Sequence, residues 1–493
     1  MKKIESLTVR AAEKKKIDFT EGKVFFKLLL FVLPIIATNL LQTFYNAADM
    51  IVVSLSSEEN AVGAIGVTGS FLGLILNVLI GFSVGANVVV AREIGAKDKQ
   101  KTQNAVHTAL VMAIIFGLGG MAAGLACSRL VMRLMGATGN LLELATRYCY
   151  IYSLGVPFLA LTNYLMAIFR AKGDSKTPLI VLSCAGLLNV GLNIFFVLVL
   201  KMSVEGVAIA TAAANLASFV ALIIKLRRDD DDTKFSFRKL KIDKQAFKDI
   251  VFNGVPAGIQ GALFSLSNML IQSSIVTVNN NSVPQGTESA PIMNGSAAAG
   301  NLESFVYTAM NAVYQGAITI TSQNVGAKKL KRIKRILYSC LLAVVSVGVI
   351  TSGVVFLLRE PLLGLYGVKS ATDDPMTKMA FETAITRFYF ILIPYFLFGI
   401  MDVCAGVLRG MGKAIVSTVI SLVGICGFRV VWLLTVFARW QTLEVIFLSY
   451  PVSWVLSEIV MFTMIQVLLR KMLKKQETEG IQEAQNAEGR IAE

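Results

Sequence analysis

The sequence predicts an all-α membrane protein in which twelve transmembrane helices form two pseudo-symmetric six-helix bundles. Three observations support this fold class. Long apolar segments recur along the 493 residues, basic residues alternate between the connections, and the two halves repeat each other.

The composition excludes a soluble globule. Hydrophobic residues make up 55% of the chain and charged residues only 16%, whereas a soluble domain usually carries about 25% charged residues. The net charge of +15 would suggest nucleic acid as the partner of a soluble chain. Because the basic residues lie between apolar blocks, we expect basic cytoplasmic loops at a lipid bilayer and no nucleic-acid partner.

The residue counts also exclude several chemistries. The only histidine is His107, and the six cysteines are scattered without a CxxC pair, which argues against zinc sites and a disulfide framework. The chain has no GxxxxGK[ST] phosphate loop and no evident nucleophile–base set. We therefore predict a protein that is not an enzyme and has no cofactor.

Twelve segments are long enough to cross a bilayer, which takes roughly 20 mostly apolar residues. They are 25–53, 63–90, 104–126, 143–168, 177–199, 205–225, 250–277, 295–322, 336–357, 381–408, 414–437 and 444–469. The start Met1-Lys2-Lys3 is followed by polar residues rather than the apolar core of a signal peptide. We interpret this start as a cytoplasmic tail.

The basic residues orient these segments. The connections on one side, with both termini, hold 37 Lys and Arg, and those on the other side hold 9; the last one, Arg429, lies inside a span. The positive-inside rule therefore predicts that both termini are cytoplasmic and that the number of spans is even. The predicted organisation is an N-terminal tail (1–24), an N-lobe (25–225), a cytoplasmic linker (226–249), a C-lobe (250–470) and a disordered cytoplasmic tail (471–493).

The two lobes repeat each other. The run GANVVVAREIGA at 85–96 matches GAITITSQNVGA at 316–327, and FRAKG at 169–173 matches LRGMG at 408–412. Each half has an even number of spans, so the repeats share one orientation, as in many secondary transporters.

Ionisable residues inside spans are costly and usually functional or paired. Five stand out: Asp49, Glu303, Asp402, Arg429 and Glu458. Asp49 shares a helix face with Gln42, Tyr45 and Asn46. Such a carboxylate is a natural binder of H+ or Na+, which makes Asp49 the candidate Na+ ligand, or else it is a structural hydrogen-bond hub.

A second polar stripe lies in the eighth span, where Glu303, Tyr307, Asn311, Tyr314 and Gln315 recur at helical spacing. A polar face is unfavourable against lipid, so we expect this face to line a cavity or to pack against another helix. We expect Glu303 to pair with Arg429, with Asp402 as a competitor for the same partner. A purely structural ion pair is the alternative.

Several of these segments resemble the bacterial MATE (multidrug and toxic compound extrusion) transporters. The resemblance rests on Pro34, Gln42 and Asp49, the segment 85–96, FRAKGDSKTP at 169–178, GNLESFVYTAMNAVYQ at 300–315 and LRGMG at 408–412, and it covers about residues 25–470. It implies two six-helix lobes around a central cavity in the bacterial inner (plasma) membrane. It also implies export of organic, often cationic, compounds in exchange for H+ or Na+, with no obligate protein partner.

The resemblance also implies site residues. In the family an Asp on span 1 works with an Asn and an Asp on span 5 and a Thr on span 6, and here Asp49, Asn189 and Thr211 match three of them. Asn193 stands where that pattern has an acidic residue, so Asp49 is the only carboxylate of this cation-coupling set, and Gln42 lies one heptad before it. The C-lobe acids Glu303 and Asp402 are candidates to compensate.

Other functions fit the sequence less well. A lipid-linked oligosaccharide flippase of the same superfamily must hold a pyrophosphate and should need several cationic residues in its cavity, and only Arg429 is plainly intramembrane. A receptor would need a domain through which to signal. A cation-coupled multidrug antiporter working by alternating access is the leading hypothesis.

Overall fold

The computed structural model describes residues 17–56, 58, 61–283 and 290–492, and all regular secondary structure in them is helical. The predicted spans correspond to helices that begin or end within several residues of the expected positions. The first six are α2 (Val24–Ser54), α3 (Ala61–Gly95), α4 (Lys99–Leu134), α5 (Gly139–Ala171), α6 (Lys176–Ile194, extended by a π-helical turn, Phe195–Val199) and α7 (Val204–Arg228).

The second half follows a short 3-10 turn at Phe237–Lys239 and contains more interruptions. It comprises α8 (Lys244–Ser282), α9 (Pro291–Gly326), α10 (Lys331–Leu357), the short α11 (Arg359–Gly364), α12 (Pro375–Arg387), α13 (Tyr395–Gly410), α14 (Ala414–Ser421), α15 (Phe428–Trp432) and α16 (Leu443–Ala492). Three π-helical stretches join or extend these pieces: Phe388–Leu392, Leu422–Gly427 and Leu433–Phe437.

The number of spans is close to the twelve predicted. Ten described helices are long and apolar enough to cross a membrane, and α12 with α13 forms an eleventh span bent by 41°. The helix α9 occupies the predicted eighth span and has 36 residues, but it is not among these eleven. Its polar stripe lowers its hydropathy, and neighbouring helices bury much of its surface. A helix surrounded by protein does not need an apolar face toward lipid.

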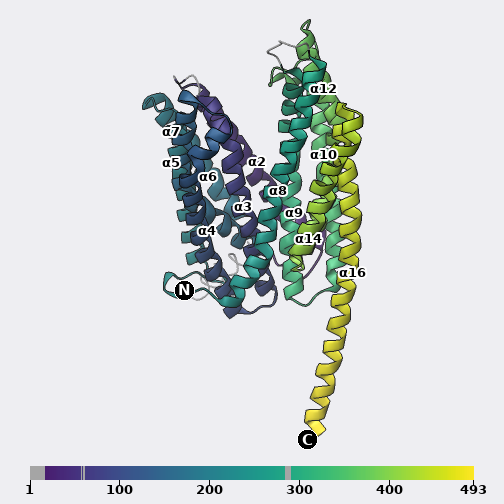
Figure 1. Cartoon of the computed structure of the whole chain (residues 1–493). Helices are drawn as coiled ribbons and strands as arrows, with labels where there is room; N and C mark the ends of the chain where they lie inside the picture. The colour runs from purple at the N-terminus through teal and green to yellow at the C-terminus, as the bar shows by residue number, and fades with distance from the viewer. Residues whose placement is uncertain (1–16, 57, 59–60, 284–289, 493) are drawn as a thin grey trace.

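The helices form two groups, the first α2–α7 and the second α8–α16, which meet at one end and diverge toward the other (Figure 1). We call the end where they meet the base; α3 and α9 end there, and α8 begins there. The base halves of α3 and α8 pack with their backbones in close contact, because Gly81 and Gly85 of α3 face Gly258 and Gly254 of α8. Small residues allow this approach between membrane helices.

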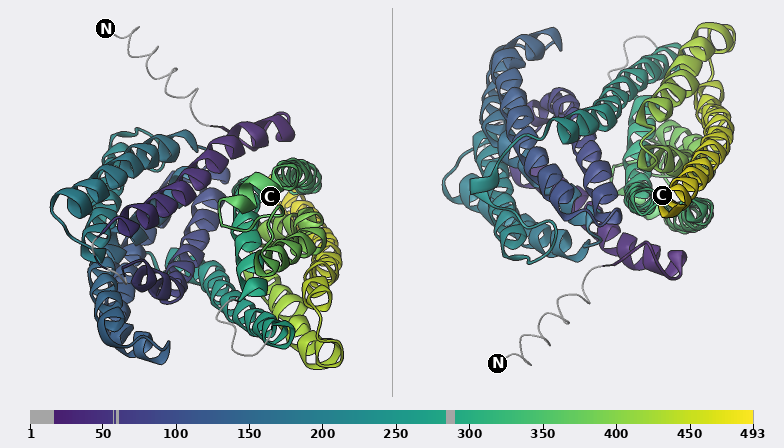
Figure 2. Two further views of the ribbon diagram at one scale, coloured as in Figure 1. Left: turned by 90° about the horizontal axis from the view of Figure 1, so that it is seen from above. Right: turned by 90° about the horizontal axis from the view of Figure 1, so that it is seen from below.

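The helix α2 lies across both groups, as the views along the long axis of the molecule show (Figure 2). In its base half, Leu28 and Val32 pack against Gly316 of α9. In its other half, the ring of Tyr45 packs on Gly186 of α6, and Val53 lies in the core of the first group. A movement of α2 would therefore act on both groups of helices.

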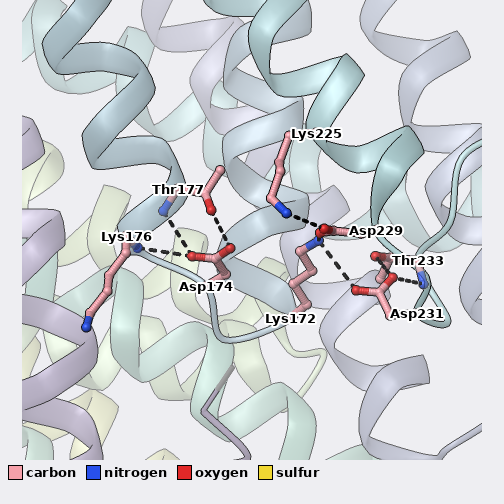
Figure 3. A network of polar contacts seen from close by, with 8 residues as sticks. All are labelled: Lys172, Asp174, Lys176, Thr177, Lys225, Asp229, Asp231 and Thr233. Atoms are coloured by element: carbon pink, nitrogen blue, oxygen red, sulfur yellow. Dashed lines mark hydrogen bonds and ion pairs between the residues drawn. The ribbon is translucent and has the colours of Figure 1, made fainter. Parts of the chain in front are cut away.

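A network of charged residues fastens the base of the first group (Figure 3). Lys172, whose side chain is 3% exposed, lies 2.5 Å from Asp229 and 3.5 Å from Asp231, and Lys225 lies 2.6 Å from Asp229. Burial opposes ionisation of Asp229, but hydrogen bonds from the two lysines hold its pKa below the usual value. Asp174 accepts hydrogen bonds from the first turn of α6. The ends of α5 and α7 are thereby tied together.

The internal repeat extends to the backbone conformation. Lys97 and Lys328, at equivalent positions after α3 and α9, both adopt positive φ, 57° and 55°. Gly173 and Gly412, which end the repeated Arg-x-x-Gly turns, have φ of 79° and 73°. Non-glycine residues with positive φ are uncommon. The equivalent pair Lys97 and Lys328, supported by the glycine pair, therefore shows that the halves share local structure as well as sequence.

The C-terminal end of the chain differs from the prediction. The segment 471–493 was expected to be disordered, but α16 continues through Ala492. Good helix formers such as Lys, Glu, Gln and Ala dominate this segment, and Lys475 and Glu479 form an i,i+4 ion pair at 3.6 Å. Most of the predicted N-terminal tail lies outside the described residues, but Phe19 is buried at the base and its carbonyl accepts a hydrogen bond from Asn324.

Candidate functional site

The predicted cation-coupling residues of the first group come together, apart from Gln42. Asn193 Nδ2 donates to Asp49 Oδ1 at 2.5 Å and to Asn189 Oδ1 at 3.3 Å. Asn189 Nδ2 donates to Thr211 Oγ1 at 3.4 Å, and the Thr211 hydroxyl also interacts with the Asp49 carboxylate. One carboxylate, two amides and a hydroxyl from α2, α6 and α7 thus form a continuous polar cluster, which we call the Asp49 cluster.

Local structure explains how these side chains meet. Asn189 and Asn193 are four residues apart on α6 and share one face, and both are buried, with 6% and 0% of their surfaces exposed. The Tyr45 hydroxyl donates to the carbonyl of Ser183 at 3.2 Å and fixes α2 against α6. Asp49, one turn further along α2, is thereby directed at Asn193.

The Asp49 cluster has the donor set of a small-cation site. A proton requires only the Asp49 carboxylate, whereas Na+ takes several oxygen ligands. Asn193 Oδ1 is buried and has no hydrogen-bond partner among the described residues, and such orphaned buried acceptors are rare. Together with the Asp49 carboxylate, Asn189 Oδ1 and Thr211 Oγ1, this atom belongs to a set of oxygens of the kind that Na+ takes. The residues therefore fit either ion.

Gln42 and Asn46 lie on the same helix as Asp49, but both are exposed. In the described part of the chain neither makes a hydrogen bond to the Asp49 cluster. Of the polar face predicted on α2, only Tyr45 and Asp49 therefore have hydrogen-bond partners on α6 among the described residues.

Glu303 does not pair with Arg429, and this expectation was wrong. Its carboxylate instead accepts two hydrogen bonds from Arg387, at 2.9 Å from Nε and 2.7 Å from Nη2. Arg387 also donates to Ser296 Oγ at 2.9 Å. Arg387 is one of the nine basic residues that the sequence assigns to the less basic side, yet it closes α12 and its side chain is only 13% exposed. Its position six residues inside the apolar range 381–408 was the signal that could have revealed it.

The other residues of the stripe on α9 form a ladder of hydrogen bonds. Gln315 Nε2 donates to Asn311 Oδ1 at 2.7 Å, and Asn311 Nδ2 donates to the Tyr307 hydroxyl at 3.1 Å. Asp402 of α13 interacts with Asn311 and lies in the field of Arg409. Through Glu303 and Asn311 the stripe therefore contacts α12 and α13.

The buried contacts of Arg409 are not predicted from the sequence. It is 5% exposed and donates to Gln260 Oε1 at 2.6 Å and to the Tyr314 hydroxyl. It thus joins α8, α9 and α13 near the base. Arg429 lies 4.0 Å from the centroid of the Tyr450 ring, and Glu458 Oε2 is buried without a described partner.

Comparison with known proteins shows the family to which the chain belongs. The MatE family model matches residues 34–195 and 256–434. The probable multidrug resistance protein YoeA of Bacillus subtilis is 25% identical over 464 residues, which cover 92% of this chain and 95% of YoeA. The multidrug export protein MepA of Staphylococcus aureus is 22% identical over 405 residues, 82% of this chain and 85% of MepA.

Solved structures show the same fold. A multidrug resistance MATE family transporter of the MOP superfamily, in an outward-facing conformation, matches with a TM-score of 0.82 and 19% identity over 93% of this chain and 99% of that chain. A MOP superfamily transporter from Pyrococcus furiosus matches with a TM-score of 0.83 and 18% identity over 92% and 98% of the two chains. Because the family model covers more than half of the residues, this chain belongs to the MATE family of membrane transporters.

Proposed function

We propose that this protein is an antiporter of the bacterial inner membrane that exports organic, often cationic, compounds in exchange for H+ or Na+. Two kinds of evidence support the proposal. The relatives YoeA and MepA are named as multidrug resistance and multidrug export proteins, and the Asp49 cluster has the donor set of a small-cation site.

The position of the Asp49 cluster supports coupling between ion binding and export. Antiport requires that the ion and the exported compound stabilise different conformations. Asp49 sits on α2, whose base half packs against α9 while its other half packs against α6. An ion bound at Asp49 would change the contacts of α2 with α6 and α7, and α2 would transmit this change to the second group of helices.

The charge distribution supports an orientation in the membrane. The basic connections after α3, α5, α7 and α9 all lie at the base, where Gln323 Nε2 donates to the Ala171 carbonyl at 2.7 Å and Arg92 pairs with Asp249 at 2.5 Å. The positive-inside rule assigns this end to the cytoplasm. The groups of helices would then be closed toward the cytoplasm and diverge toward the exterior, with both termini cytoplasmic.

The proposal is tested with purified protein in liposomes under an imposed pH or Na+ gradient, with ethidium as the transported cation. We expect the wild type to accumulate ethidium under one of the gradients and Asp49→Asn to lose this accumulation. Glu143→Gln, which neutralises an exposed acid on α5, is the matched control and should transport normally. Accumulation by Asp49→Asn equal to that of the wild type would refute the coupling role. Absence of transport under either gradient would shift the assignment to a lipid-linked oligosaccharide flippase.

A further inference from the structure

A cavity lies within the second group of helices, away from the Asp49 cluster. It has a volume of about 330 Å³, and α8, α9, α12, α13, α15 and α16 contribute to its lining. This is the lower end of the size range of small-molecule sites, about 300–1,000 Å³.

Aromatic side chains form one wall of this cavity. Trp454 is 1% exposed, and its ring centroid lies 5.5 Å from those of Tyr395 and Phe398 and 5.9 Å from that of Tyr450. Tyr395 and Phe398 stack on each other at 5.7 Å. Rings held by mutual contact offer apolar surface without a large loss of side-chain freedom on binding.

The charges in the cavity do not balance. Glu303 and Arg387 neutralise each other through two hydrogen bonds, whereas Arg429 is only 5% exposed and has no carboxylate within 4.0 Å in the described part of the chain. Its Nε is buried without a hydrogen-bond partner among these residues. The face of the Tyr450 ring, 4.0 Å away, offsets part of the cost of burying this cation, but it supplies no acceptor for the guanidinium N–H groups.

Local backbone geometry positions the arginine. Arg429 belongs to the five-residue α15, which lies between the π-helical stretches Leu422–Gly427 and Leu433–Phe437. Arg387 likewise directly precedes the π-helical Phe388–Leu392. Such stretches change the direction in which side chains leave a helix and are frequent at functional sites. Both guanidinium groups thus reach the same cavity from different helices.

We propose that this cavity is a binding subsite for organic acids with an aromatic body, in which Arg429 pairs with the carboxylate and the aromatic wall holds the rings. The guanidinium fork matches a carboxylate in geometry, and one of its donors, the buried Nε, has no acceptor among the described residues. The inference rests on the proposed function for one point, that a compound held here is transported, and it extends the exported compounds from organic cations to acids.

The test is equilibrium binding to the purified full-length protein in detergent, without a gradient, by isothermal titration calorimetry. The probes are 1-naphthoate and 1-naphthylmethylammonium, which share the aromatic body and differ in charge. We expect the wild type to prefer naphthoate by tenfold or more. Arg429→Gln should lose this preference and Arg429→Lys should retain part of it. Arg439→Gln, which removes an exposed arginine that also contacts an aromatic ring, Trp440, should bind as the wild type does.

Equal binding of the two probes by the wild type would overturn the proposal, as would unchanged naphthoate binding in Arg429→Gln. Should Arg429→Gln not fold, the charge preference of the wild type and the intermediate affinity of Arg429→Lys decide the question. Ethidium transport by the wild type separates the two proposals. Transport without naphthoate selectivity refutes only the subsite, and naphthoate selectivity without gradient-driven transport refutes only the antiport.

Discussion

Removing the carboxylate of Glu303 should strongly destabilise the second group of helices. Glu303 is 4% exposed and binds Arg387 through two hydrogen bonds of 2.9 and 2.7 Å. Glu303→Ala would leave the Arg387 guanidinium buried with only Ser296 Oγ as a described acceptor. Breaking one partner of a buried ion pair costs about 3–5 kcal/mol, because the remaining charge is uncompensated. We therefore expect Glu303→Ala to lower the free energy of unfolding by about 3–5 kcal/mol.

The double variant Glu303→Met with Arg387→Met separates charge from packing. Replacing both members of a buried pair by apolar residues of similar volume is often neutral or stabilising. The double variant should therefore be more stable than Glu303→Ala, with most of the roughly 3–5 kcal/mol recovered. Glu382→Ala, which removes an exposed acid from α12, should change stability by less than about 0.5 kcal/mol.

The assay is thermal unfolding of the purified variants in one detergent. For a unit of about 150–250 residues, 1 kcal/mol corresponds to about 2–4 °C in Tm, so Glu303→Ala should lower the Tm by on the order of 10 °C. A double variant as unstable as Glu303→Ala would show that packing, not the unpaired charge, is responsible. A Tm for Glu303→Ala equal to that of Glu382→Ala would refute the reasoning altogether.

Three further predictions concern the base and the Asp49 cluster. In Gly81→Val the added side chain meets the backbone of Gly258, so spin labels on α3 and α8 at the base should report longer distances than in the wild type. The control Gly119→Val, at a position with open space, should leave these distances unchanged. The Asp229 pKa is held below its usual value, so its stabilisation should be complete above about pH 4 and be lost as the pH falls through the lowered pKa. Tm measured against pH should show this loss in the wild type and a smaller loss in Lys172→Gln, where Lys225 remains 2.6 Å from Asp229. An identical decline in both would contradict the prediction. Asn193→Asp adds a second carboxylate 2.5 Å from the first, so ethidium release in a binding assay should occur at lower coupling-ion concentration than in the wild type; an unchanged ion dependence would count against the site.

The all-α membrane fold class, the internal repeat and most helix positions could be predicted from the sequence, because they depend on long apolar runs and on duplicated turns. The repeat of 85–96 at 316–327 is visible in the residues alone, and the equivalent Lys97 and Lys328 that follow it share a positive φ. Asp49 and Asn193, which the resemblance groups in one site, are in contact. That they bind an ion and couple it to transport stays a prediction.

Side-chain partners between distant helices were harder to predict. Glu303 and Arg387 are 84 positions apart, and hydropathy alone does not show which arginine a bent span turns inward. The π-helical stretches around Arg429 shift the helical register, so a face projected with regular α-helical spacing misplaces the residues beyond them. The continuation of α16 to Ala492 was missed for another reason, since a polar composition fits an exposed helix as well as a disordered tail.

The central claim, that Asp49 couples an ion to the exported compound, is tested most directly by the ion dependence of substrate affinity. Ethidium binding to detergent-purified protein would be measured by fluorescence polarisation between about pH 5 and about pH 8, with and without Na+. Linkage predicts that the affinity of the wild type for ethidium falls as the concentration of the coupling ion rises, by at most about tenfold for a tenfold change in that concentration. Asp49→Asn should bind ethidium with an affinity that does not depend on the ion. The same ion dependence in Asp49→Asn as in the wild type would contradict the account.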